Sequence, residues 1–147
     1  LKIHMLGKLQ SNKAKKAVSI FDYIHSLDNE KLANILKKSE VELGKKLAYF
    51  IQVNFANEKQ KSGVPVSDAM SFYKYCKNEI NLNIVGLMCF PPFESESDKY
   101  FKDAYDLNNQ LGLKELSMGM SNDYIKAIKH GSTFVRIGSA IFGERKI

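Results

Sequence analysis

The segment KLAYFIQVN, residues 46–54, is the stretch that says most about the fold. It is a nearly continuous apolar run of strand length, which is typical of a strand buried on both of its faces. Such strands belong to parallel sheets whose faces are covered by helices. The segment therefore predicts a parallel α/β architecture.

Strand and helix patterns alternate along the rest of the chain. Besides 46–54, we expect strands at 2–6, 22–27, 82–89, 115–120 and 133–138. We expect helices after Ser11 or Asn12, from Asp28 or Asn29 to about Lys38, from Ser67 to about Lys77, over 96–111 and over 122–131, and a last helical turn at 139–143. The polar segment 55–66 is expected to be a loop.

Six strands, each followed by a helix, predict a parallel sheet with right-handed crossovers. An open doubly wound sheet and a closed barrel both fit this alternation. A TIM-type barrel has eight units of roughly 30 residues each, and the chain begins with Leu1 inside an expected strand. We therefore expect residues 1–147 to form a single domain. It would be a (β/α)₈ TIM-type barrel with the first two strand-helix units missing from this chain.

Composition excludes several classes of function. The 147 residues are 44% hydrophobic, yet no apolar run approaches the roughly 18 residues of a membrane span. The net charge of +6 is carried almost wholly by lysine, whereas nucleic-acid binders more often combine arginine with exposed aromatic residues. The two cysteines lack the spacing of metal ligands. We expect a monomeric, cytoplasmic protein that binds neither nucleic acid, membrane nor metal.

Two segments at expected strand ends are suited to binding an anion. LSMGMSND (116–123) and IGSA (137–140) both place glycine and serine where a strand runs into a helix. Small residues let backbone N–H groups approach an anion, and barrels often hold phosphate between the loops after their last two strands. Tight turns with helix caps explain the same residues equally well. The residues alone leave both interpretations open.

Arg136 lies inside the apolar segment FVRIG, two residues before Gly138. In a strand its side chain faces away from those of its neighbours Val135 and Ile137. One interpretation is a salt bridge at the rim of the barrel. The other is a fixed cation that points at a ligand in the barrel mouth.

Five further segments carry a resemblance to a known family. They are LQSNK (9–13), QVN (52–54), KSG (61–63), GLM (86–88) and, most specific of all, the segment that runs from LSMGMSND to RIGSAIFG (116–143). In these segments the chain resembles the pyridoxal-phosphate homeostasis protein family, over essentially its whole length. That family is similar to the barrel domain of bacterial alanine racemase.

The resemblance implies a barrel that holds pyridoxal 5′-phosphate (PLP). It implies that Ser121, Gly138 and Ser139 bind the phosphate, with Gly119 giving room. Arg136 would face the pyridine nitrogen and keep it unprotonated, which weakens the ring as an electron sink. The resemblance further implies a pocket lined by Asn12, Asn54 and Met88. Lys61 is a candidate for anion contact, although a solvated loop lysine explains it as well.

The lysine that forms the Schiff base in this family lies upstream of Leu1, so we assign no catalytic residue. Ser139 replaces the usual threonine and keeps its hydroxyl. The resemblance implies a protein of intracellular PLP homeostasis that stores the cofactor or delivers it to PLP-dependent apo-enzymes, affects amino-acid balance and has no established turnover.

Two alternatives remain. One is a PLP-dependent, racemase-like enzyme acting on amino acids, which needs a tyrosine or cysteine as acid or base at the pocket mouth. Cys89 is the only thiol near a strand end, and we expect it to be a buried apolar residue instead. The other alternative is a barrel that binds a different phosphorylated metabolite.

Overall fold

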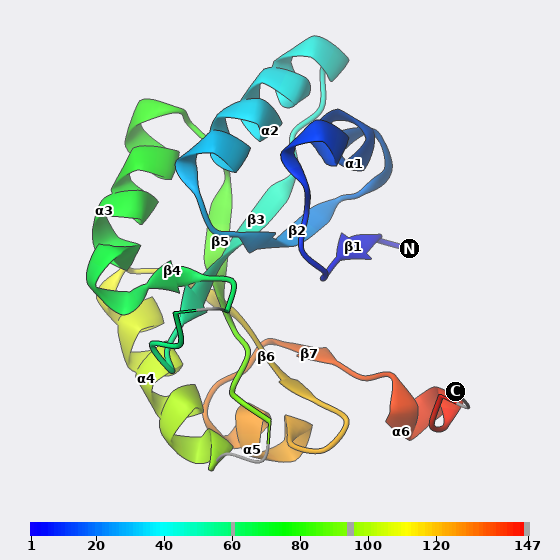
Figure 1. The fold of residues 1–147 in the computed structure, drawn as a ribbon, viewed down its shortest axis with the longest axis vertical. Coiled ribbons are helices and arrows are strands. Elements are labelled where there is room, and N and C mark those ends of the chain that lie inside the picture. The colour runs from blue at the N-terminus through cyan, green and yellow to red at the C-terminus, as the bar shows by residue number, and fades with distance from the viewer. Residues whose placement is uncertain (60, 94–95, 146–147) are drawn as a thin grey trace.

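The computed structural model describes residues 1–59, 61–93 and 96–145. Its strands form one curled sheet in which every described pair is parallel. The strand order around the curl is β1 (His4–Met5), β2 (Tyr23–Leu27), β3 (Ala48–Asn54), β5 (Ile84–Cys89), β6 (Glu115–Met120) and β7 (Phe134–Arg136) (Figure 1). The predicted fold class, a parallel α/β sheet with barrel curvature, is confirmed.

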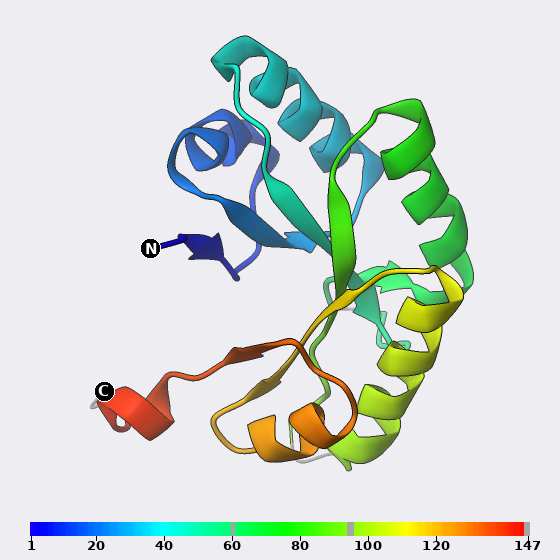
Figure 2. The ribbon, with the colours of Figure 1, turned by 180° about the vertical axis from the view of Figure 1, so that it is seen from behind.

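Helices cover the outer side of this sheet (Figure 1). They are α1 (Ala14–Ile20), α2 (Glu30–Leu43), α3 (Ala69–Lys74), α4 (Ser97–Gln110) and α5 (Tyr124–Lys129), and the short helix α6 (Ser139–Phe142) follows the last strand. Figure 2 shows the sheet curving until its first and last strands face each other across an open side. Because the strands are parallel, their C-terminal ends all lie along one rim of the curled sheet.

Aromatic rings fill the concave side of the sheet. His25 stacks on Phe50 with ring centroids 4.2 Å apart, and Phe50 meets Phe134 edge-on at 5.3 Å. His4 on β1 stacks on Tyr23 at 4.2 Å and lies 5.8 Å from Phe134 on β7. The two end strands of the described sheet are thus linked through their side chains, because the rings span the interior between them.

The convex side of β3 packs against α2. Tyr49 donates its hydroxyl hydrogen to Glu40 Oε1 at 2.9 Å, and the same oxygen accepts the backbone N–H of Leu47 at 2.8 Å. Glu40 is almost fully buried, and burial beside this carboxylate raises the pKa of Tyr49. The expected helix end near Lys38 is therefore wrong, because Glu40 faces the sheet and the helix continues to Leu43.

Other boundaries also differ from the sequence-based expectations. The expected loop 55–66 contains β4 (Val64–Pro65), because Val64 is buried and pairs with Val53. The expected helix from Ser67 to Lys77 is divided into a 3-10 turn (Val66–Asp68), α3 and a π-helical turn (Tyr75–Glu79). Ser67 does not cap it and donates to Asp68 instead. The expected strands 2–6 and 133–138 shorten to β1 and β7, which have one neighbour each.

Gly86 gives a test of how closely β5 and β6 approach. A Cβ at this position would lie 1.9 Å from the backbone oxygen of Glu115, so alanine forces the two strands apart. We expect Gly86→Ala to lower the free energy of unfolding by about 3 kcal/mol or more, the upper end of the cost of overpacking. Urea unfolding measures this, with Gly7→Ala as control, because a Cβ at Gly7 meets nothing within 4 Å. Equal stability of the two variants contradicts the strand pairing described here.

Candidate functional site

The turn that follows β7 closes onto the end of β6 through Ser121. The Ser121 hydroxyl oxygen accepts two backbone N–H groups, that of Gly138 at 3.1 Å and that of Ala140 at 3.2 Å. A Cβ at Gly138 would meet no atom within 4 Å, so the space beside this turn is open. Two N–H groups that converge beside a hydroxyl make a donor set suited to a phosphate oxygen.

Gly119 has a packing role in this arrangement. Its φ of +95° lies in the left-handed region, and a Cβ there would lie 2.6 Å from the Cβ of Ala127 and 3.0 Å from the Cα of Tyr124. The glycine therefore lets α5 lie directly on the end of β6. Four residues further on, the Asp123 carboxylate accepts the backbone N–H of Met120 at 2.7 Å and holds the turn.

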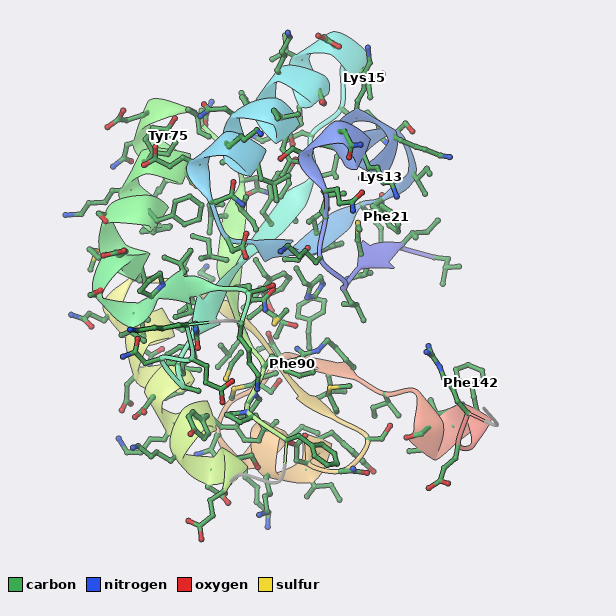
Figure 3. The ribbon with its side chains drawn as sticks, viewed as in Figure 1. Lys13, Lys15, Phe21, Tyr75, Phe90 and Phe142 are labelled. Carbon is green, nitrogen blue, oxygen red and sulfur yellow. The ribbon has the colours of Figure 1, made fainter. Side chains whose placement is uncertain are left out.

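Arg136 points into the interior of the curled sheet. Its Nη1 donates to the Ser117 hydroxyl at 2.9 Å and its Nη2 donates to the backbone oxygen of Cys89 at 3.0 Å. The guanidinium carbon lies 5.8 Å from the centroid of the Phe90 ring, which Figure 3 labels near the middle of the molecule. Burial lowers the pKa of Arg136, and no carboxylate among the described residues forms an ion pair with it. The rim salt bridge is therefore not what these residues form.

Two histidines extend the contacts of Arg136 across the interior. His25 Nδ1 lies 2.8 Å from the Ser117 hydroxyl, and His25 Nε2 lies 3.0 Å from His4 Nδ1. Burial, together with smaller contributions from the nearby His4 and Arg136, lowers the pKa of His25 to about 3. His25 is therefore a neutral imidazole at neutral pH.

The remaining candidates from the sequence lie in different surroundings. Met88 is buried on β5 and is the register partner of Ser117. Asn54 donates its side-chain amide to the backbone oxygen of Glu58, and Lys61 forms an ion pair with the Glu58 carboxylate at 2.9 Å. Asn12 is exposed in a 3-10 turn (Ser11–Lys13). The described contacts thus join Ser121 with Gly138. They also join Arg136 with Ser117, which pairs with Met88 in the sheet. No described contact links these residues to Asn12, Asn54 or Lys61.

Cys89 faces away from the interior. Its thiol lies 3.8 Å from the backbone oxygen of Tyr100 on α4, and burial raises its pKa to about 12. The prediction that Cys89 is a buried residue is confirmed. It does not supply the acid or base that a racemase-like reaction needs.

Ser117, His25, His4 and Ala140 are the residues of the site that sequence reasoning missed. Ala140 contributes only its backbone N–H, so its residue type gives no signal in the sequence. Ser117 lies two residues before Gly119 on the strand leading to the predicted phosphate turn, so alternation along the strand was a usable signal for it. Nothing in the local sequence of His4 or His25 indicates that they meet.

The described part of the chain contains neither a cluster of metal-binding side chains nor a membrane-spanning helix. Across residues 1–59, 61–93 and 96–145, no three metal-binding side chains gather in a way that could hold an ion. No helix in that part of the chain is long and apolar enough to cross a membrane.

Comparison with known proteins gives a consistent result. Residues 1–146 match the family model for the alanine racemase N-terminal domain. Pyridoxal phosphate homeostasis proteins of Aquifex aeolicus and Schizosaccharomyces pombe are 37% and 38% identical to this chain, over 99% and 97% of it and 68% and 65% of their own lengths. PipY of Synechococcus elongatus PCC7942, solved with PLP bound, aligns at a TM-score of 0.90 and 36% identity over 97% of this chain and 71% of its own. Alanine racemase of Corynebacterium glutamicum (TM-score 0.71, 14% identity, 99% of this chain and 42% of its own) shares the fold.

The curled parallel sheet and the family model define the same class of protein, an α/β barrel of the alanine racemase N-terminal type. Within that class the chain belongs to the pyridoxal phosphate homeostasis protein family. It spans about two thirds of the length of the curated relatives it matches.

The buried His25 predicts a definite pH dependence of stability. Its folded-state pKa of about 3 lies below the ordinary value of 6.5, so between these values the unfolded chain binds the extra proton. We expect the free energy of unfolding to fall as the pH drops from 6.5 toward 4, by at most about 1.4 kcal/mol per pH unit for one proton.

Urea unfolding at fixed pH values measures this slope in the native chain and in His25→Gln. The variant should lose much of the slope, while the less buried His4, whose pKa is also lowered by burial, adds a smaller part in the same direction. His130→Gln serves as control, because His130 lies on the outer surface beside Asp98. An unchanged slope in His25→Gln contradicts a neutral, buried His25.

Proposed function

We propose that this chain binds PLP at the rim formed by the ends of β6 and β7, and that the protein stores the cofactor or delivers it to PLP-dependent apo-enzymes in the cytoplasm. The observation that carries the proposal is the pair of N–H groups held on Ser121, directly after the strand that carries the buried Arg136. The family and the PLP-bound PipY structure support the same ligand.

The Ser121 turn would hold the phosphate. The N–H groups of Gly138 and Ala140 would turn from the Ser121 oxygen to a phosphate oxygen, and the Ser121 hydroxyl would then donate as well. Ser139 is exposed at the first position of α6, where its hydroxyl is available as a further donor. Neutral donors of this kind bind a dianion without a neighbouring lysine, which the backbone-based phosphate sites of other barrels also do.

Arg136 would face the ring nitrogen. Bound PLP supplies an aldehyde for amine chemistry and an electron-withdrawing ring. A guanidinium has no acceptor and does not give up its proton, so Arg136 would donate to the ring nitrogen and would leave it unprotonated. With an arginine as its partner, the ring nitrogen would stay unprotonated and the ring would be a weaker electron sink. With Cys89 turned toward α4, this supports a holding function over an amino-acid racemase.

The proposal of storage and delivery rests on two points: the relatives are named pyridoxal phosphate homeostasis proteins, and the proposed site would make the ring of PLP a weak electron sink. The two cysteines of the chain are free and buried, which supports a reducing, cytoplasmic environment. We propose the apo forms of PLP-dependent enzymes as recipients, because these enzymes bind the same cofactor.

A phosphate-specific variant tests the binding site. We expect Ser121→Ala to weaken PLP binding by about tenfold or more, because a hydrogen bond to a charged group is lost. Isothermal titration measures PLP and pyridoxal, which lacks the phosphate, against the chain with any natural flanking sequence retained. Pyridoxal binding should not change.

Ser67→Ala is the matched control, since Ser67 is an exposed serine in the turn before α3. An equal loss of PLP and pyridoxal affinity in Ser121→Ala contradicts the phosphate role. Ribose 5-phosphate that binds as tightly as PLP would point to a general phosphate site instead.

Delivery is tested with a PLP-dependent apo-enzyme and a phosphatase that destroys free PLP. We expect the PLP-loaded protein to restore activity of the apo-enzyme in the presence of phosphatase, while an equal amount of free PLP does not. Ser121→Ala should protect the cofactor less. Restoration at the same rate from free and bound PLP argues against delivery and leaves binding as the whole function.

A further inference from the structure

Four side chains from four strands form one hydrogen-bonded chain through the interior. It runs from Arg136 on β7 to Ser117 on β6, then to His25 on β2 and His4 on β1, with steps of 2.9, 2.8 and 3.0 Å. The middle step crosses the interior, because β6 and β2 are not neighbours in the sheet. The chain therefore couples the arginine to the opposite side of the barrel.

Donor chemistry sets the direction of this chain. Arg136 has no acceptor, so the Ser117 oxygen must accept from it. The Ser117 hydroxyl hydrogen then has one acceptor among its described contacts, His25 Nδ1. Neutral His25 carries its proton on Nε2 and donates it to His4 Nδ1. The opposite order would leave the Ser117 hydrogen without an acceptor in the buried part of the described structure.

The same contacts fix the plane of the guanidinium. Nη1 is held by Ser117 and Nη2 by the Cys89 carbonyl, so the planar group cannot turn about the Cδ–Nε bond without breaking a buried hydrogen bond. Ser117 is fully buried and His25 is 1% exposed, which protects these bonds from exchange with water. The N–H bonds of Arg136 that have no partner among the described residues consequently point in set directions.

We propose that Ser117, supported by His25 and His4, is the positioning residue that orients Arg136 toward the ring nitrogen of PLP and thereby makes the site select a ring with an unprotonated nitrogen. This inference rests on the proposed function. Arg136 touches the ligand, and Ser117 acts through Arg136 alone. Its loss should therefore matter for a ligand that has the ring nitrogen and should not matter for one that lacks it.

The experiment compares PLP with 1-deaza-PLP, in which a carbon replaces the ring nitrogen, by isothermal titration against the chain with any natural flanking sequence retained. We expect the native chain to bind PLP more tightly than the analogue. Ser117→Ala should weaken PLP binding about tenfold, equivalent to about 1.4 kcal/mol, and change analogue binding by less than about twofold. Ser26→Ala is the matched control, because Ser26 Oγ is also buried and has no hydrogen-bond partner among the described residues.

A spectroscopic readout separates orientation from simple loss of stability. With ¹⁵N-labelled PLP, the ring-nitrogen chemical shift should move in Ser117→Ala toward that of free, unprotonated PLP, and should stay in place in Ser26→Ala. His25→Phe keeps a ring to stack on Phe50 but removes the acceptor of Ser117, and it should shift the signal in the same direction.

The outcomes distinguish the two levels of inference. Equal losses for PLP and its analogue in Ser117→Ala, or no loss for either, overturn the positioning role while PLP binding by the native chain still stands. A native chain that binds the two ligands equally well also overturns it. A native chain that binds neither ligand overturns the proposed function itself, and the positioning role with it.

Discussion

Arg136 carries a positive charge into a part of the barrel that is almost closed to water. The neighbouring strands must therefore supply hydrogen-bond acceptors for its guanidinium. A buried guanidinium is tolerated when its N–H groups find acceptors. Here the acceptors are a hydroxyl and a backbone carbonyl, both neutral, contributed by the two strands next along the curl, β6 and β5. The register of the parallel strands therefore determines whether the cation is stable. The turn that we propose to hold the phosphate is positioned by the same strand, because Gly138 follows Arg136 by two residues.

Neutral acceptors also decide what the cation can do. A carboxylate partner would neutralise Arg136 and compete with any ligand for its donors. Ser117 and the Cys89 carbonyl accept N–H groups of Arg136 without neutralising its charge, and its other N–H groups have no hydrogen-bond partner among the described residues. An oriented guanidinium is a good host for a lone pair and a poor source of protons. In the proposed PLP site, chemistry that relies on a protonated ring would therefore be weak, and retention of the intact cofactor would be favoured.

The architecture followed from the sequence because it depends on patterns that a single chain carries. The apolar run 46–54 and the alternation of strand and helix were enough to predict a parallel, barrel-like sheet. The errors came where tertiary contacts override local polarity. Glu40 lies beyond the expected helix end near Lys38, yet it is buried against Tyr49 and α2 extends past it. Val64 looks like part of a polar loop, yet it pairs with β3.

The site was predictable to a lesser degree. Ser121 and Gly138 could be found because small residues at strand ends are a local signal, and the structure brings them into contact. Arg136 could be picked out because a cation inside an apolar strand is unusual. The link from Ser117 to His25 joins positions 92 residues apart across the interior, and no local pattern encodes such a contact. Ala140 acts through its backbone, so its identity carries no information.

The Ser121 turn has a consequence for how readily a ligand comes and goes. Because the serine oxygen already holds the N–H groups of Gly138 and Ala140 in one turn, little ordering of the backbone would be needed when a phosphate binds there. The same oxygen competes for those N–H groups, which caps the affinity that a phosphate can reach. Fast exchange at moderate affinity is what a reservoir requires. In the proposed storage function, the Ser121 oxygen would thus keep the cofactor from being bound too tightly to be released.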